Sequence, residues 1–143
     1  MRKNKKKLSN IFKKNKIDFC FQYKNKGKYE IKIIYKQHLK NMNSMFLECP
    51  SLTYLNLSNF NTINVNSMNC IFNQCHSLIS LNLSYFNTKN VINMESISNN
   101  FSSLVSLNLS NFNTINVNNM RYNFSECFSL IFLNFLILIL IMI

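Results

Sequence analysis

Cysteine and histidine are the side chains of this sequence that could bind a metal. Cys70, Cys75 and His76 lie within seven residues of one another. A structural zinc site needs four ligands, usually in two closely spaced pairs, and no second pair accompanies this one. Cys49, Cys75 and Cys127 instead lie at multiples of 26 residues, which predicts small buried side chains in a repeating structure. We expect no metal, and free thiols in a reducing compartment, because the cysteine count is odd.

Acid-base chemistry has equally little support. The carboxylates are Asp18, Glu30, Glu48, Glu95 and Glu126. They are scattered and do not recur as a pair, and neither His38 nor His76 has an acid and a nucleophile in a recognisable arrangement. A single glycine, Gly27, excludes a glycine-rich phosphate loop. The sequence therefore predicts a protein that is not an enzyme and has no cofactor.

Positive charge is concentrated at the beginning of the chain. Fourteen of the sixteen Lys and Arg residues fall in residues 1–40, where only Asp18 and Glu30 oppose them. The basic arm comprises Arg2, Lys3, Lys5, Lys6, Lys7, Lys13, Lys14 and Lys16. It could be a solvated, disordered tail, or bind nucleic acid or an anionic membrane, or act as a nuclear import signal. No apolar run of the secretory type follows it, which favours an intracellular location.

A repeat of 26 residues decides the expected fold. The aligned columns include Leu52, Leu78, Leu104 and Leu130; Leu55, Leu81, Leu107 and Leu133; Met42, Met68, Met94 and Met120; Phe60, Phe86 and Phe112; and Val65, Val91 and Val117. Complete units run over 51–76, 77–102 and 103–128, after a half-unit at 39–50 and before a decaying unit from Ser129. Repeats of this length indicate units that stack on one another to bury a shared core.

Each unit contains two patterns. In residues 51–58 apolar and polar residues alternate, with Leu55 and Leu57 on one side, which predicts a strand. From Met68 to Cys75 the apolar residues are spaced three and four apart, which predicts a short helix. The expected fold is therefore α/β, a solenoid of 26-residue units that each hold a strand and a short helix.

The repeat resembles the BspA-like leucine-rich repeat, in the version known from mycoplasma surface proteins as a domain of unknown function. The resemblance rests on Ser-Leu-x-x-Leu-Asn-Leu-Ser-x-Phe-Asn-Thr-x-Asn-Val-x-x-Met followed by Phe-x-x-Cys, over 39–135. It implies a leucine-rich-repeat solenoid without catalytic activity, often in cell-surface adhesion proteins. Asn replaces the family's frequent Asp at several positions, which removes its acidic character. Ser98 and Phe101 replace the usual Phe and Cys, so we expect that unit to pack differently.

The two ends predict further segments. Residues 1–16 form the basic arm, and alternation on both sides of Gly27 predicts a β-hairpin over 17–38 that caps the solenoid at 39–135. Residues 136–143 are an apolar tail. The tail could be a last strand, a membrane anchor, although it is shorter than the roughly 20 residues of a spanning helix, or the relic of a truncated gene. A tail of this kind could also mediate self-association.

Outward-facing residues of the strands form the candidate recognition surface, which we call the strand face. They are Tyr54, Asn56, Ser58, Ser80, Asn82, Ser84, Ser106, Asn108 and Ser110. We expect an interaction protein that binds a protein or glycan partner there and has a surface or adhesion role. The alternatives are binding to membrane or nucleic acid through the basic arm, and a degenerate repeat protein that has lost its function.

Overall fold

The computed structural model describes residues 39–58 and 60–134. Four strands of three residues lie in this part: β1 (Tyr54–Asn56), β2 (Ser80–Asn82), β3 (Ser106–Asn108) and β4 (Phe132–Asn134). They form two parallel pairs, β1 with β2 and β3 with β4. No helix occurs in the described residues. The expectation of an α/β leucine-rich-repeat solenoid of strand and helix units is therefore wrong.

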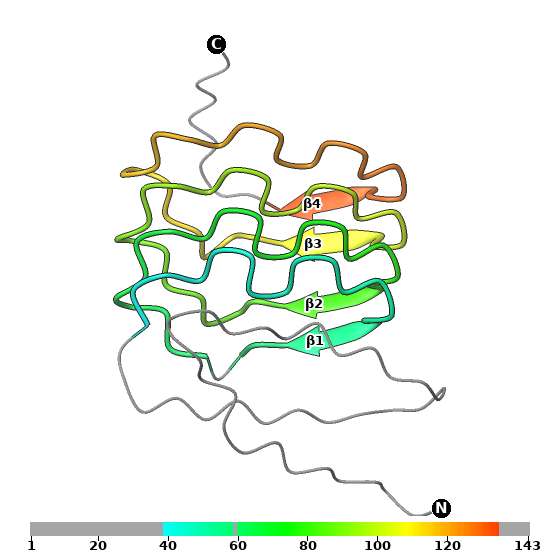
Figure 1. Cartoon of the computed structure of the whole chain (residues 1–143), viewed down its shortest axis with the longest axis horizontal. Helices are drawn as coiled ribbons and strands as arrows, with labels where there is room; N and C mark the ends of the chain where they lie inside the picture. The colour runs from blue at the N-terminus through cyan, green and yellow to red at the C-terminus, as the bar shows by residue number, and fades with distance from the viewer. Residues whose placement is uncertain (1–38, 59, 135–143) are drawn as a thin grey trace, which may run out of the picture.

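Successive lengths of chain lie one above the other in the register of the repeat. We call them rungs: residues 39–64, 65–90, 91–116 and 117–134. Leu55 pairs with Leu81, and Leu107 pairs with Leu133, as the 26-residue alignment predicts. Single parallel bridges at Asn41, Ser67, Asn93 and Asn119 link all four rungs. Figure 1 shows β1 to β4 side by side in chain order, with the first rung at one end and the last at the other.

A run of tight turns replaces each expected helix. In the second rung, Cys70 and Gln74 have φ values of 54° and 63°, in the left-handed region that a right-handed helix excludes. Their N–H groups, and that of Phe72, donate to carbonyls of the third rung at 2.8–3.2 Å instead of to residues four positions back. The same turns recur at 43–48, 95–100 and 121–126.

The turns explain why the apolar spacing was misleading. Apolar residues three and four apart lie on one side of a helix, but Met68, Ile71, Phe72 and Cys75 are also all buried in these turns. A left-handed non-glycine residue costs about 1–2 kcal/mol. Hydrogen bonds between rungs, worth about 1 kcal/mol each, offset that cost, and an isolated unit has no neighbouring rung to form them with.

The core runs through the middle of the stack. Val65 and Val91, Leu78 and Leu104 are fully buried members of the predicted columns. Phe rings also follow one another along the stack: Phe46 and Phe72 have centroids 5.6 Å apart, and Phe86 and Phe112 lie 6.3 Å apart. These aligned side chains supply the apolar burial that a three-residue strand alone does not provide.

The third rung packs differently from the others, as predicted. Ser98 stands in the Phe column and Phe101 in the Cys column, and both side chains are 0% exposed. The Phe101 ring lies 6.4 Å from that of Phe72 in a tilted arrangement. The large and small residues have thus exchanged places, and Phe101 fills from the Cys position the space that a Phe at 98 would occupy.

A buried threonine also joins neighbouring rungs, and the sequence patterns assigned no role to it. Thr88 Oγ1 donates to the carbonyl of Asn113 at 3.0 Å and accepts from the N–H of Asn113 at 2.7 Å. Thr62 and Asn87 form the same pair one rung earlier. The recurring Asn-Thr dipeptide is therefore a connection between rungs.

The predicted arm at 1–16, the capping hairpin at 17–38 and the tail at 136–143 lie outside the described residues.

Candidate interaction face

The strand face lies on the exposed side of the strands. Tyr54 and Asn56 are on β1, Ser80 and Asn82 on β2, and Ser106 and Asn108 on β3. The pairing places Tyr54 beside Ser80 and Asn56 beside Asn82. Ser58, Ser84 and Ser110 lie two residues after the last Asn of their strands. Six of the nine side chains are exposed, and those of Ser58, Asn82 and Ser110 are half-buried.

The asparagines of this face also shape the backbone. Asn56, Asn82 and Asn108 each accept, through Oδ1, the N–H of the serine two residues later, at 2.9–3.0 Å. Asx turns of this type end a strand by giving its backbone another hydrogen-bonding partner. These bonds use the side-chain oxygen Oδ1 of each asparagine, and the side-chain nitrogen Nδ2 takes no part in them. The face therefore offers a partner a column of amide donors on a fixed backbone.

Asparagine has the same structural role elsewhere in the repeat. Asn61, Asn87 and Asn113 accept from the N–H two residues later, at 3.0–3.1 Å. Asn90 and Asn116 donate through Nδ2 to carbonyls of the preceding rung, at 2.8 Å. A compositional bias towards Asn thus coincides with positions where its side chain bonds to the backbone.

An exposed apolar column borders the strand face, and the sequence patterns missed it. Ile79, Val105 and Ile131 each precede a strand, and they are 50%, 45% and 73% exposed. The repeat register aligns them with Thr53. The signal was readable, since three β-branched apolar residues at 26-residue spacing lie outside the columns that form the core. Their exposure adds an apolar border to a polar face, a combination common in binding surfaces.

The cysteines occupy structural positions. Cys49 and Cys75 are buried, as their column predicts, whereas Cys127 in the same column is half-buried. Cys75 Sγ donates to the carbonyl of Phe46 at 3.0 Å. Burial raises the pKa of the Cys127 thiol above its ordinary value, although hydrogen bonds from nearby backbone lower it in part. Within the described residues no group of three His, Cys, Asp or Glu side chains could hold a metal.

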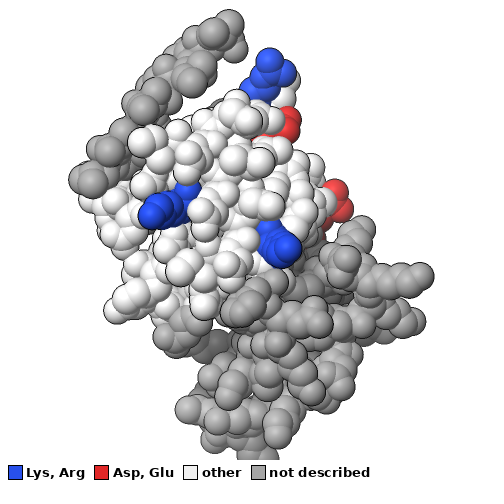
Figure 2. Space-filling model, turned by 90° about the vertical axis from the view of Figure 1, so that its left-hand side faces the viewer, with Lys and Arg blue, Asp and Glu red and all other residues white. Residues whose placement is uncertain are grey.

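Charged side chains are sparse on the described part of the protein. It contains Lys40, Lys89 and Arg121 against Glu48, Glu95 and Glu126, so its formal net charge is zero. In the space-filling view most of this surface is white, with a few separate Lys and Arg side chains in blue and Asp and Glu side chains in red (Figure 2). The Glu95 side chain is hydrogen-bonded, since its Oε2 accepts from Asn119 Nδ2 at 3.0 Å. The described residues also include no helix that is long and apolar enough to cross a membrane.

The fold and this face define a repeat protein whose surface side chains recur at a fixed spacing. Residues 6–131 match the family described as Mycoplasma protein of unknown function, DUF285. The chain belongs to this family. No curated protein and no solved structure matches it.

Proposed function

We propose that the protein is a non-catalytic binding protein that recognises a protein or glycan partner through the strand face. The observation that carries the proposal is the regular array of uncharged side chains on β1, β2 and β3, most of which are exposed. Amide donors, hydroxyls and the Tyr54 ring are groups that suit sugar hydroxyls or a polar protein surface. The BspA-like resemblance of the repeat supports a role in adhesion or at a cell surface.

A binding assay with paired variants tests this proposal. The labelled full chain is applied to arrayed glycans and to immobilised matrix proteins. Tyr54→Ala and Ser80→Arg change exposed side chains for which no turn-forming hydrogen bond is seen, so we expect the fold to persist and binding to weaken tenfold or more. Tyr85→Ala is the matched control, because Tyr85 is 73% exposed and lies off the strands. Equal binding by all three variants would reject the strand face as the site.

The basic arm supports a second candidate function. Since the described residues are neutral overall, the net charge of +11 comes from outside them. We therefore propose, as the alternative, that the arm binds an anionic membrane or nucleic acid while the repeats serve as a scaffold. Binding to anionic vesicles or duplex DNA should then fall steeply between about 50 and 200 mM salt and disappear when residues 1–16 are removed. Salt-independent binding would contradict this alternative.

A further inference from the structure

A second face of the stack is built by the turns that follow the strands. They lie at residues 61–66, 87–92 and 113–118, one in each repeat. Each turn is closed by a bond from the N–H of a valine to the carbonyl of the threonine three residues earlier, at 2.9–3.0 Å. Figure 1 shows these turns one above another, on the side of the stack towards which the strands point. We call this side, together with Lys40, the loop face.

Isoleucine and lysine side chains are exposed together on the loop face. They are Ile63, Lys89 and Ile115 in one column of the repeat, and Lys40 and Ile92 in the neighbouring column. Ile63, Ile92 and Ile115 are 49%, 48% and 73% exposed. In the first column the lysine lies between the two isoleucines, and successive rungs are about 4.8 Å apart. The loop face therefore presents aliphatic and cationic groups side by side.

Hydrogen bonds within the chain already satisfy the polar backbone groups beneath these side chains. The N–H groups of Ile63, Lys89 and Ile115 donate to Oδ1 of the asparagine two residues earlier, at 3.0–3.1 Å. The carbonyls of Ile63 and Lys89 accept from Nδ2 of an asparagine in the next rung, at 2.8 Å. The N–H and carbonyl of Ile92 bond to the rungs on either side, at 2.9 and 3.0 Å. An apolar medium could therefore cover Ile63, Lys89 and Ile92 without leaving these backbone groups unpaired.

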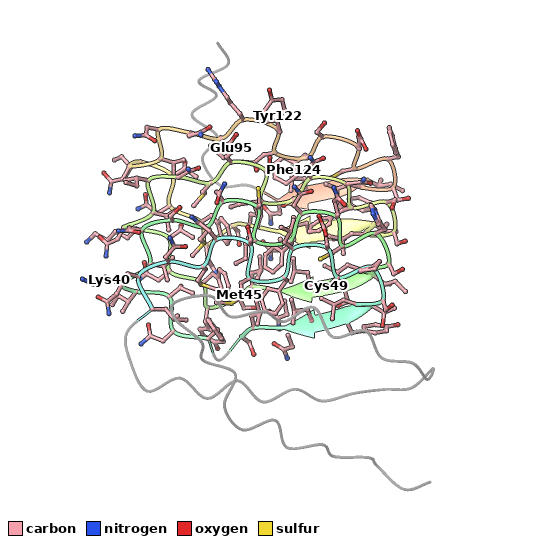
Figure 3. All side chains as sticks on the ribbon, in the orientation of Figure 1. Lys40, Met45, Cys49, Glu95, Tyr122 and Phe124 are labelled. Atoms are coloured by element: carbon pink, nitrogen blue, oxygen red, sulfur yellow. The ribbon has the colours of Figure 1, made fainter. Side chains whose placement is uncertain are left out.

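The charges that the described residues place on the loop face are all positive. The carboxylates of the described part, Glu48, Glu95 and Glu126, lie instead in the turns at 43–48, 95–100 and 121–126. Figure 2 views this side of the stack, and its red side chains lie towards one margin. Figure 3 places Lys40 on the same side, and fourteen of the sixteen Lys and Arg residues fall at or before it in the sequence. The most basic part of the sequence is thus joined to the stack at the loop face.

We propose that the loop face docks on the surface of an anionic lipid membrane. The exposed isoleucines enter the boundary between headgroups and acyl chains, and the two lysines stay at the level of the lipid phosphates, because a lysine can bury its stem while its ammonium remains in water. Aliphatic side chains favour lipid over nucleic acid, whose bases stack on aromatic rings. The inference rests on the second proposed function, membrane binding by the basic arm, and adds a contact made by the repeats themselves.

Tryptophan fluorescence tests insertion directly, because the sequence contains no Trp. Ile115→Trp and Ile131→Trp are matched probes in the full chain, since both isoleucines are 73% exposed and Ile131 precedes β4, at the other end of the strands. With vesicles of equal parts phosphatidylcholine and phosphatidylserine, the emission of Ile115→Trp should shift to shorter wavelength and that of Ile131→Trp should not. Equal shifts of both probes, or no shift in a vesicle-bound protein, would overturn the proposal.

Sedimentation with the same vesicles measures the contribution of each side chain to affinity. Ile63→Asp and Ile92→Asp should each weaken binding of the full chain roughly tenfold. Lys89→Gln should weaken it about fivefold. Ile79→Asp is the matched control, because Ile79 is 50% exposed and precedes β2, and it should leave binding unchanged.

The same experiment separates this inference from the function on which it rests. Binding that is lost on removal of residues 1–16 but unaffected by Ile63→Asp and Ile92→Asp would make the arm the whole contact, and would refute the loop face alone. Absence of binding to the anionic vesicles would refute both. Binding to duplex DNA without binding to the vesicles would assign the positive charge to nucleic acid and would also refute membrane docking.

Discussion

The exchange of large and small residues in the third rung makes a quantitative prediction. Phe101→Cys should destabilise the protein by about 3 kcal/mol, because the ring is completely buried and truncating a buried Phe costs about 3–5 kcal/mol. Ser98→Phe alone should also destabilise, by about 1–3 kcal/mol, since Ser98 is 0% exposed and Phe101 already fills the adjoining space.

The double variant Ser98→Phe with Phe101→Cys should be far more stable than the sum of the single changes allows. It restores the arrangement of the second rung, where Phe72 stacks on Phe46 and the Cys75 thiol donates to a carbonyl. It also removes the Ser98 hydroxyl, which is buried with no hydrogen-bonding partner among the described residues and so costs about 1–3 kcal/mol. We expect a favourable coupling energy of about 3 kcal/mol between the two positions.

Equilibrium unfolding in urea measures all four free energies, with equal m-values as the check that the transitions are comparable. Ser98→Ala is the control for the hydroxyl alone, and it should be neutral or slightly stabilising. Additive effects, with a coupling energy below about 0.5 kcal/mol, would refute the conclusion that the two residues share one space.

Three further predictions concern other contacts. Thr88→Val should cost about 2 kcal/mol in urea unfolding because it leaves the N–H and carbonyl of Asn113 unpaired, whereas Thr88→Ser should retain most of the stability. Asn82→Ala should cost about 1 kcal/mol through loss of its Asx turn, and Asn82→Asp, which keeps the acceptor, should cost less; equal losses would contradict the turn's role. Because burial raises the pKa of the Cys127 thiol, its contribution to stability is present below the ordinary thiol value of 9.0 and is lost as pH rises through the folded pKa. The unfolding free energy of the unaltered chain should therefore fall more steeply above pH 9 than that of Cys127→Ser.

Part of this structure was predictable from the sequence, because period and register are properties of aligned side chains. The columns of Leu55 with Leu81 and of Leu107 with Leu133 are paired as the repeat predicts. The conformation between Met68 and Cys75 was not predictable from its pattern, since turns with left-handed residues at Cys70 and Gln74 bury the same positions as a helix. Hydrogen bonds to a neighbouring rung favour the turns over the helix. The spacing of residues within one unit does not predict these bonds.

The candidate site was predictable to a similar degree. Alternation located the exposed strand residues, but it assigned Asn56, Asn82 and Asn108 only to the strand face and gave them no structural role. The spacing of Asn and Ser two residues apart was the available signal for Asx turns. The exposed column of Ile79, Val105 and Ile131 was missed because apolar residues in a repeat were assigned to its core.

The hydrogen bonds between rungs have a consequence for how such a protein can change over generations. Each joins a residue to another about one repeat away, as in Thr62 with Asn87 and Thr88 with Asn113. A recombination event that duplicates or removes 26 codons therefore leaves every remaining contact type intact, wherever in the repeat the crossover falls. Insertion of a single codon, by contrast, would misalign Phe, Thr and Val columns between adjacent rungs. The number of whole repeats can thus change with little effect on the contacts between the remaining rungs.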